Sequence, residues 1–303
     1  MAFFEKALKA KVMSTHLLIR ANVSKTILLQ AFKIATDFED RYSAYKPDSF
    51  LNTINQHAGI SSVPCTLADM HLFHTAMHAS KETHGLFDIS IGALSHGAYH
   101  FGFANQQIVS NKDLKHIQSL VNYHNIVLSD QTIYLKHKGM RLDLGGIGKG
   151  YVAKQIALFL AQHGATKILV DVGGEIVTRG KSYTIAIKDP FREGNIAYIK
   201  TTKEDTSIST SGSYERFIDK KHHHILDTHK GVSNPYYSAM TILQNSWHID
   251  MLDAYATALF NQPESQLSAL SSTLNIALIA IDTQQKIIQK NMNTFTLKSL
   301  QFL

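Results

Sequence analysis

Residues 140–172 have the sequence MRLDLGGIGKGYVAKQIALFLAQHGATKILVDV, which carries the clearest secondary-structure pattern in the chain. The apolar spacing predicts a strand, a glycine-rich turn, an amphipathic helix and a second strand, at Met140–Leu144, Gly145–Gly150, Tyr151–His163 and Lys167–Val172. Gly164 follows the helical pattern and is typical of a helix end. We therefore expect one strand–helix–strand unit at the centre of the fold.

The elements on either side of this unit differ in kind. Helical spacing predominates before it and strand patterns predominate after it. The expected helices are 26–42, 66–84, 112–122 and 249–261. The expected strands are 125–135, 182–188, 196–201, 206–210, 214–219, 238–243 and 275–281, and a turn-like segment is expected at 43–55. This order favours an α+β fold, with mixed sheets and flanking helices, over a doubly wound sheet.

The composition excludes several classes of protein. Of the 303 residues, 44% are hydrophobic and 18% are charged, so the chain can bury a sizeable core and is not of the disordered type. No apolar run approaches the roughly 18 residues that a membrane helix needs. The single cysteine, Cys65, excludes a disulfide framework and a cysteine-rich metal centre. The net charge of +6 is spread over scattered Lys and Arg, which disfavours nucleic acid and suits an anionic small ligand.

The N-terminal sequence MAFFEKALKAKVM has no secretory pattern. It lacks an apolar stretch followed by a small-residue cleavage site, and it has no lipoprotein cysteine. We expect a cytoplasmic protein, or a periplasmic one whose signal has been removed.

The glycine-rich turn has more than one interpretation. It is not a P-loop, because Gly150 follows Lys149 where that motif needs Ser or Thr. Residues 148–153 do match the dinucleotide-binding pattern G-x-G-x-x-A, and Asp171 lies at the end of the next expected strand. More generally, glycines at a helix start let the backbone approach a phosphate, and Lys149 adds positive charge. The remaining alternative is that the glycines are needed only for packing of the turn.

Three further groups of polar residues could carry chemistry. Asp253 and Thr257 are four apart on an expected helix and share one face, where their oxygens could hold Mg²⁺. Thr210–Gly212 follows a strand, and small hydroxyl residues beside glycine suit phosphate or ribose contacts. His224 and Asp227 lie at a strand end and could do acid–base work. Each group also has an ordinary alternative: a surface helix pair, a hairpin turn and a surface ion pair.

Taken in their order along the chain, these signals resemble the FAD:protein FMN transferases, the ApbE-type flavin transferase family. The resemblance runs from about residue 13 to residue 281. The blocks that carry it are Arg41–Tyr45 with Ser49 and Asn55, Gly85–Gly92, Leu142–Tyr151, Asp171–Glu175, Thr210–Gly212, His224–Asp227 and Asp253–Thr257. Four of them are similar to the family patterns G-x-F-D, LDLGG-x-x-KG, H-I-[IL]-D and D-A-x-A-T.

This resemblance implies a fold and an activity. The fold is a single ApbE-like domain over residues 1–303, with a T-fold-like core and two subdomains that meet at the FAD site. The activity is transfer of the FMN half of FAD to a Ser or Thr hydroxyl of an acceptor flavoprotein, assisted by Mg²⁺, with AMP as the leaving group. The alternatives are an FAD pyrophosphatase, which releases FMN and AMP, and a non-catalytic flavin or dinucleotide binder.

The resemblance also implies roles for individual residues. The Mg²⁺ ligands are the side chains of Asp253 and Thr257 and the backbone carbonyl of Gly146. Lys149 faces the phosphates or the adenosine of FAD. The rest of the FAD site consists of Ser43, Tyr45, Phe87, Asp88, Thr210, Ser211 and Gly212. His224 and Asp227 lie at the reacting end, with Asp227 favoured as the group that accepts the proton of the target hydroxyl.

Two positions beside Asp227 differ from the family pattern. The family has Pro after this aspartate and Thr before the following glycine, whereas this chain has Thr228 and Lys230. The difference bears on the rate and on the choice of acceptor more than on FAD binding.

Overall fold

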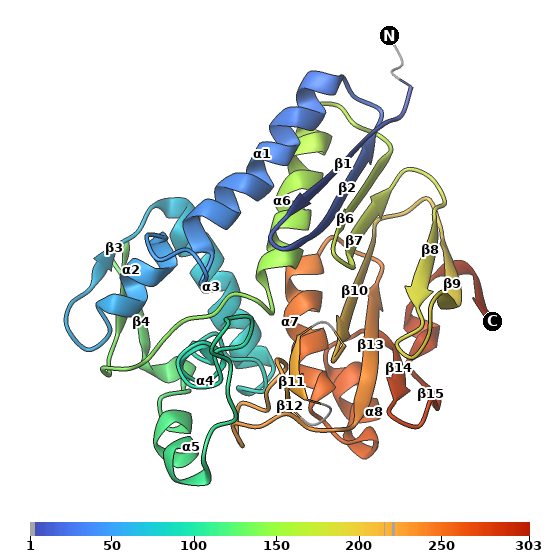
Figure 1. Ribbon diagram of the computed structural model, residues 1–303. Coiled ribbons are helices and arrows are strands. Elements are labelled where there is room, and N and C mark those ends of the chain that lie inside the picture. Colours follow the sequence, from blue (N-terminus) through green and yellow to red (C-terminus); the bar gives the residue numbers. More distant parts are fainter. Residues whose placement is uncertain (1–3, 215, 220–221) are drawn as a thin grey trace.

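The core of the molecule is an eight-stranded antiparallel sheet with the strand order β1-β2-β6-β7-β10-β13-β14-β15. The structure is a computed structural model that describes residues 4–214, 216–219 and 222–303. In sheet order, the strands are Lys6–Val12, Thr15–Ala21, Ile168–Val172, Glu175–Arg179, Thr206–Gly212, Tyr237–Gln244, Ala277–Asp282 and Ile287–Lys290. The N-terminal hairpin joins the sheet through β6, where Leu17 lies opposite Val172 (Figure 1).

One face of this sheet is covered by α1, α6 and α7, which span Lys25–Tyr42, Gly148–Gln162 and Ile249–Phe260. Helix α1 begins after Ser24, whose side chain accepts a hydrogen bond from the N–H of Ile27. Helices α6 and α7 touch at Gly150, where a Cβ would lie 2.4 Å from the carbonyl oxygen of Ile249. A glycine is therefore required for this close contact between the two helices.

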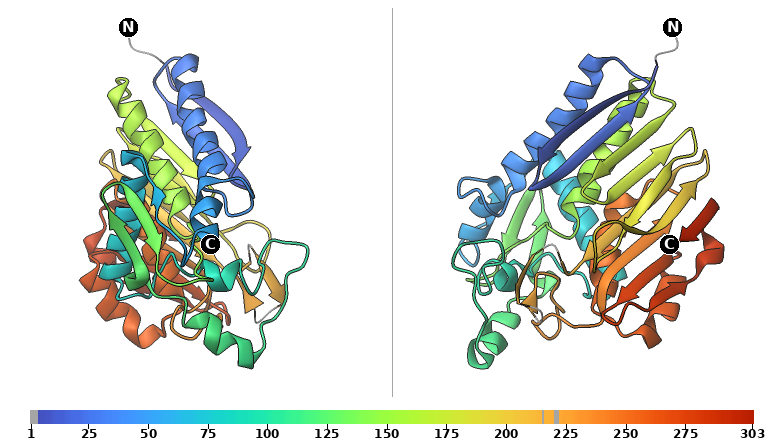
Figure 2. Two further views of the ribbon diagram at one scale, coloured as in Figure 1. Left: turned by 90° about the vertical axis from the view of Figure 1, so that its left-hand side faces the viewer. Right: turned by 45° about the vertical axis from the view of Figure 1, so that its right-hand side comes forward.

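A smaller sheet covers part of the other face. Its strands, in the order β16-β9-β8, are Leu297–Phe302, Asn195–Thr201 and Thr184–Lys188. Successive residues of a strand point to opposite faces, so Val170 belongs to the core under the helices while Leu169 belongs to a second buried cluster. That cluster also contains Ile187 of β8 and Ile279 of β14. The middle of the central sheet is thus buried on both faces, with helices on one side and the small sheet on the other (Figures 1 and 2).

The remaining elements form a loop-rich part beyond the end of α1. Its helices are α2 (Phe50–Gln56), α3 (Leu67–Glu82), α4 (Gly92–Ser95) and α5 (Asn111–Gln118). A small sheet, in the order β3-β5-β4, consists of Val63–Pro64, Thr132–Leu135 and Ile126–Ser129. The hairpin of β11 (Phe217–Asp219) and β12 (His222–His223) lies beside this part, whereas the helix α8 (Glu264–Thr273) packs against β15 of the central sheet. Helix α3 packs against α7 and joins this part to the helix layer.

The structure confirms the expected α+β class with mixed sheets and flanking helices. The four long helical patterns correspond to α1, α3, α5 and α7, with ends shifted by a few residues. Most expected strands after the central unit are also present as β8, β9, β10, β13 and β14. The expected strand 214–219 is reduced to β11, and its Glu215 lies outside the described residues.

The prediction of a strand at Met140–Leu144 is wrong. This segment makes only one isolated bridge, between Ile91 and Arg141. The N–H of Leu142 donates to Asn55 Oδ1 at 2.7 Å, and its carbonyl accepts from Asn55 Nδ2 at 3.2 Å. A distant side chain thus bonds the backbone groups that a neighbouring strand would have bonded. The central unit therefore consists of α6 and β6 after an extended segment.

Several elements have no counterpart among the expected ones. The N-terminal hairpin β1–β2, the strand β7, the helix α8 and the strands β15 and β16 were not anticipated. Helix α2 lies inside the segment expected to be turn-like, and it begins after Ser49, whose side chain accepts from the N–H of Asn52. Within the described part of the chain, no helix is both long enough and apolar enough to cross a membrane.

Candidate functional site

A cavity of about 630 Å³ brings together segments from most of the chain. Its wall includes the turn between β1 and β2, the end of α1, the start of α6, the strand β8 and the end of β10. The residues predicted from the sequence that line it are Ser43, Tyr45, Phe87, Asp88, Gly146, Lys149, Thr210, Ser211, Gly212, His224, Asp253 and Thr257. Asp227 is the one predicted site residue that the structure places outside the cavity wall.

The three predicted metal ligands meet where α6 approaches α7. Gly146 lies against Thr257, because a Cβ at Gly146 would be 2.9 Å from Thr257 Oγ1. Four residues earlier on the same face of α7, Asp253 Oδ2 accepts a hydrogen bond of 2.9 Å from the N–H of Gly150. Asp253 thereby caps the start of α6, where the helix dipole favours a negative charge.

Two buried carboxylates share one lysine at this junction. Lys149 Nζ lies 2.7 Å from Glu175 Oε1 and 3.8 Å from Asp253 Oδ1. Burial, followed by repulsion from Asp253, raises the pKa of Glu175 to about 8. Burial also raises the pKa of Asp253 above its usual range, although Lys149 opposes the shift. When both carboxylates are ionised, the three groups carry one net negative charge, which a cation would balance.

The chemistry of this junction fits magnesium. Its available donors are a carboxylate, a hydroxyl and a backbone carbonyl, and Mg²⁺ prefers oxygen ligands. Among the residues that the structure describes, no three His, Cys, Asp or Glu side chains gather as a metal site. An Mg²⁺ ion commonly takes only one or two protein carboxylates, and water and phosphate oxygens complete its coordination. The residues present therefore suit an ion that is bound together with a phosphate-bearing substrate.

His224 presents a neutral imidazole to the cavity. Its Nδ1 lies 3.0 Å from the carbonyl oxygen of Arg216, and a carbonyl can only accept, so Nδ1 carries the hydrogen. The other ring nitrogen, Nε2, then has a free lone pair. Burial lowers the pKa of His224 to about 4, with repulsion from Arg216 as a further cause. His224 is consequently uncharged at neutral pH, with Nε2 as its hydrogen-bond acceptor.

Asp227 is occupied within its own loop. Its Oδ1 accepts from the N–H groups of His229 and Lys230, at 3.0 and 3.1 Å. Its Oδ2 accepts from Asn234 Nδ2 at 2.9 Å and lies 3.3 Å from Lys230 Nζ. The neighbouring Thr228 donates from Oγ1 to the carbonyl of Gly85 at 2.6 Å. Both positions that depart from the family pattern, Thr228 and Lys230, therefore stabilise this loop.

Tyr45 lies in an aromatic and cationic part of the wall. Its hydroxyl accepts from Arg216 Nη1 at 2.7 Å and donates to the carbonyl of Phe101 at 3.2 Å. Its ring centroid lies 5.0 Å from those of both His96 and Phe103. Such a wall suits a planar ring system carried on an anionic chain.

The side-chain oxygens of Asp88 and Ser43, two residues of the cavity wall, accept hydrogen bonds from other residues of the protein. Asp88 Oδ1 accepts from the N–H and the hydroxyl of Ser90, at 2.8 and 2.6 Å, and Oδ2 accepts from the N–H of Tyr123 at 2.7 Å. Ser43 Oγ accepts from the N–H of Tyr45 at 3.2 Å. These bonds fix the loops on which Phe87 and Tyr45 reach the cavity.

Sequence reasoning missed a histidine–aspartate pair in the cavity wall. His96 Nε2 lies 3.0 Å from Asp143 Oδ2, which also accepts from the hydroxyl of Ser95 at 2.7 Å. Burial raises the pKa of Asp143, but His96 and the hydrogen bonds outweigh it and bring that pKa well below its usual range. Asp143 belongs to the family block Leu142–Tyr151, whereas His96 lies in no motif. No sequence pattern therefore indicated that the two side chains are in contact.

The dinucleotide-binding interpretation of the glycine-rich turn does not hold. That motif belongs to a parallel strand–helix–strand unit, but β6 runs antiparallel to both of its neighbours, β2 and β7. Asp171 is also engaged elsewhere: Oδ1 accepts from the N–H of Gly174 at 2.9 Å, and Oδ2 lies 3.1 Å from His16 Nε2. Asp171 therefore holds the β6–β7 turn.

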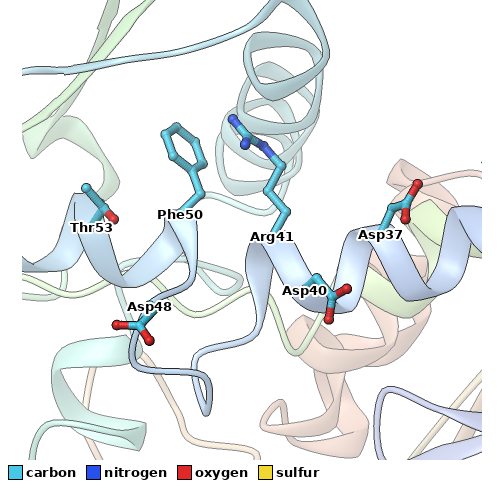
Figure 3. A pocket seen from close by; sticks show the side chains of 6 residues that line it. All are labelled: Asp37, Asp40, Arg41, Asp48, Phe50 and Thr53. Carbon is cyan, nitrogen blue, oxygen red and sulfur yellow. The ribbon is translucent and has the colours of Figure 1, made fainter.

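A second hollow, of about 490 Å³, lies on the outside of α1 and α2. It is lined by Asp37, Asp40, Arg41, Asp48, Phe50 and Thr53, and Figure 3 shows Arg41 and Phe50 pointing to the same side. Asp37 pairs with Lys33, and Arg41 pairs with the buried Asp69. An acidic lining repels phosphate, so this hollow does not compete with the large cavity as a nucleotide site.

Comparisons with known proteins point to one family. A family model described as the ApbE family matches residues 12–280. An FAD:protein FMN transferase from Klebsiella pneumoniae (strain 342) is 29% identical over 267 residues, which cover 86% of this chain and 83% of that relative. An FAD:protein FMN transferase from Treponema pallidum (strain Nichols) is 28% identical over 223 residues, which cover 66% of this chain and 61% of that relative.

A solved structure extends the likeness to the fold. The flavin transferase ApbE from Vibrio cholerae matches with a TM-score of 0.83 at 23% identity, and the match covers 97% of this chain and 99% of that chain. At this level of identity the match concerns the fold alone.

Proposed function

The chain belongs to the ApbE family, and we propose that it performs flavin transfer with one magnesium ion held between α6 and α7. It is an enzyme that transfers FMN from FAD to a target protein. In our proposal the FMN ends on a Ser or Thr hydroxyl of an acceptor flavoprotein, and AMP is released. We take residues 1–303 as one ApbE-like domain in which two subdomains meet at the FAD site.

One observation supports the proposed site most strongly. The family blocks lie far apart in the sequence, yet residues from most of them line a single cavity. Gly146, Asp253 and Thr257, whose oxygens we propose as the ligands, all line this cavity, as does Lys149. A substrate pyrophosphate bound there would meet both a cation site and a fixed ammonium group.

The residues at the α6–α7 junction neutralise charge on the pyrophosphate. Cleavage of a phosphoanhydride depends on positioning and on stabilisation of negative charge more than on covalent catalysis. Bound Mg²⁺ supplies Lewis-acid stabilisation of phosphate oxygens. The Lys149 ammonium lies beside Glu175, which fixes its position. Asp253 is held in turn by the N–H of Gly150, so the ligand is ordered before the substrate arrives.

We assign proton transfer to His224 rather than to Asp227. The oxygen of the target hydroxyl attacks the FMN phosphorus, its proton passes to His224 Nε2, and the phosphorus–oxygen bond to AMP breaks. AMP leaves with the electron pair of that bond, and a phosphoester links FMN to the target. His224 has the free lone pair that this step needs, whereas four hydrogen-bonding or ionic contacts occupy Asp227. Asp227 holds the loop that carries His224 to the cavity.

The proposed function is tested with the purified protein and FAD. The reaction contains Mg²⁺ or a chelator, with a pool of short synthetic peptides of random sequence around one fixed threonine as acceptor. We expect Mg²⁺-dependent AMP release, matched by an equal amount of FMN on peptide. Free FMN in that amount, with no labelled peptide, would favour the pyrophosphatase. FAD that stays intact under all of these conditions would overturn the proposed site.

A further inference from the structure

Strand β8 has one open edge. It pairs with β9 on one side, and no strand within the described residues pairs with its other side. The N–H of Thr201 donates to the carbonyl of Tyr183, so these two residues form a hydrogen-bonded pair. In an antiparallel ladder such as β8–β9, every second residue of a strand bonds to its partner strand. The odd-numbered residues of β8 therefore bond to β9. The even-numbered residues turn their N–H and C=O groups toward the open edge: Thr184, Ala186 and Lys188.

This edge forms part of the wall of the active-site cavity. Residues 185–188 line the cavity, whereas Thr184 lies outside its lining. Among the described strands that lie at the edge of a sheet, β8 alone contributes residues to this wall. The cavity thus has a row of backbone donors and acceptors along one side.

Tyr214 links the open edge to the segment expected to bind FAD. Its ring lies 5.0 Å from Lys188 Nζ. It also packs on Gly212, where a Cβ would be 2.5 Å from the ring. Gly212 and Thr210 lie on β10, which continues into the cavity wall. An occupant of the β8 edge would therefore lie next to bound FAD.

We propose that the part of the β8 edge that lines the cavity, residues 185–188, is the docking edge for the target protein, which binds as an added β-strand that carries the acceptor hydroxyl. The proposal rests on the function proposed above, because flavin transfer requires a polypeptide to bring a Ser or Thr side chain into this cavity. An extended segment is the occupant that can use unpaired N–H and C=O groups of a strand edge. Side chains of such a segment alternate, so one hydroxyl can enter the cavity while its neighbours point away.

Recognition of this kind would let one enzyme accept targets that differ in sequence. Most of the binding free energy comes from main-chain hydrogen bonds, which every extended segment offers. The exposed Ala186 has a small side chain, which leaves room for the side chain of an added strand. Sequence preference then depends on the few side chains that meet the cavity wall.

The first test compares two proline variants of the same strand edge. Ala186→Pro removes an outward N–H beside the cavity, and Thr184→Pro removes the equivalent N–H outside it. Proline is tolerated at edge positions whose N–H is not bonded within the sheet. With the threonine peptide pool and FAD, we expect Ala186→Pro to lower the rate of flavin transfer about tenfold. Thr184→Pro should transfer at close to the wild-type rate, and circular dichroism with Tm shows whether each variant folds.

A second test leaves the enzyme unchanged. The best acceptor peptide from the pool is resynthesised with a single N-methyl group at each amide in turn. An added strand donates every second N–H to β8, so transfer should fall with a period of two along the peptide. Equal sensitivity at all positions, or none, overturns docking at a strand edge. Normal transfer by a folded Ala186→Pro variant overturns it as well.

The failure of this proposal can be told from a failure of the proposed function. Wild-type protein that labels the peptides, with no loss of transfer in a folded Ala186→Pro variant and no period of two along the N-methyl series, contradicts the strand-docking proposal alone. AMP release with free FMN and no labelled peptide contradicts the proposed transfer. Wild-type protein that leaves FAD intact with Mg²⁺ and peptides contradicts the proposed function on which it rests. An equal loss of transfer in both proline variants also overturns the proposal. Such a loss would come from a general effect of proline on β8 and not from the missing N–H group beside the cavity.

Discussion

Gly150→Ala should separate the two helices that carry the proposed metal site. In an unconstrained helix, replacing Gly by Ala stabilises by about 1 kcal/mol. Here the new Cβ would lie 2.4 Å from the carbonyl oxygen of Ile249, 2.8 Å from Asp253 Cβ and 3.0 Å from Asp250 Cα. These atoms belong to the backbone or stand directly beside it, so α7 has to move away from α6.

The cost of that movement exceeds the gain in helix propensity. Overpacking a close contact costs about 1–3 kcal/mol. The hydrogen bond from the Gly150 N–H to the Asp253 carboxylate is also lost, which costs about 1.5–3 kcal/mol. We therefore expect Gly150→Ala to lower the free energy of unfolding by about 2–5 kcal/mol net. Because Asp253 moves, Mg²⁺-dependent AMP release from FAD should fall as well.

Urea denaturation and AMP release at saturating FAD measure these two effects. Gly164→Ala is the matched control at the other end of α6, because a Cβ there meets nothing within 4 Å. Its φ of +83° is unfavourable for Ala, so it should lose about 1–2 kcal/mol of stability and keep its activity per folded molecule. A Gly150→Ala protein as stable and active as wild type would refute the close-contact reasoning.

Three further substitutions test the site. Asp253→Asn should reduce AMP release by at least about a hundredfold and abolish any rise in Tm caused by Mg²⁺, because it removes the carboxylate ligand. Lys149→Gln should lower the free energy of unfolding by about 3–5 kcal/mol in metal-free buffer above pH 8, as measured by urea denaturation, because two buried ionised carboxylates then lose their shared cation. His224→Ala should change the pH dependence of stability: the folded pKa of about 4 lies below the ordinary 6.5, so wild type loses up to about 3 kcal/mol as the pH falls from 6.5 to 4. The variant should lack that loss, as measured by urea denaturation at each pH.

The Asp253 and His224 variants each have a control that shares their burial or their chemistry. Asp250→Asn removes another buried carboxylate of α7, which pairs with Lys154 and does not line the cavity. It should lower stability and leave the response to Mg²⁺ intact; an equal loss of that response would contradict the ligand role of Asp253. His229→Ala removes an exposed histidine of the same loop, and its pH profile of stability should match wild type. A His224→Ala profile that also matches wild type would contradict the buried, neutral state of His224.

Local sequence patterns predicted the parts of the site that short-range geometry determines. The spacing of Asp253 and Thr257 places both on one face of any helix, and the helix was evident from its apolar periodicity. A helix was also predicted directly after the glycine-rich turn, although it begins at Gly148 rather than at Tyr151, so its first residues are the last three of the predicted turn. The ordered blocks then indicated one family and, through it, a common cavity.

Contacts between distant segments could not be predicted in this way. The strand expected at Met140–Leu144 failed because Asn55 bonds the backbone of Leu142. The pairing of His96 with Asp143 likewise has no local signal. The preference for Asp227 over His224 came from a motif that cannot show where a carboxylate points. In the first two cases a partner far away in the sequence decided the outcome, and the role of Asp227 stays a prediction.

The pairing of β2 with β6 has a consequence for how the protein folds. Leu17 finds its partner Val172 only after about half of the chain has been synthesised. Non-local pairing of this kind slows folding and leaves an early hairpin without its neighbour during translation. The outer strand β1 carries exposed Lys6, Lys9 and Lys11, and charged edges resist pairing with other chains. These lysines would therefore protect the nascent hairpin from aggregation until the middle of the sheet emerges from the ribosome.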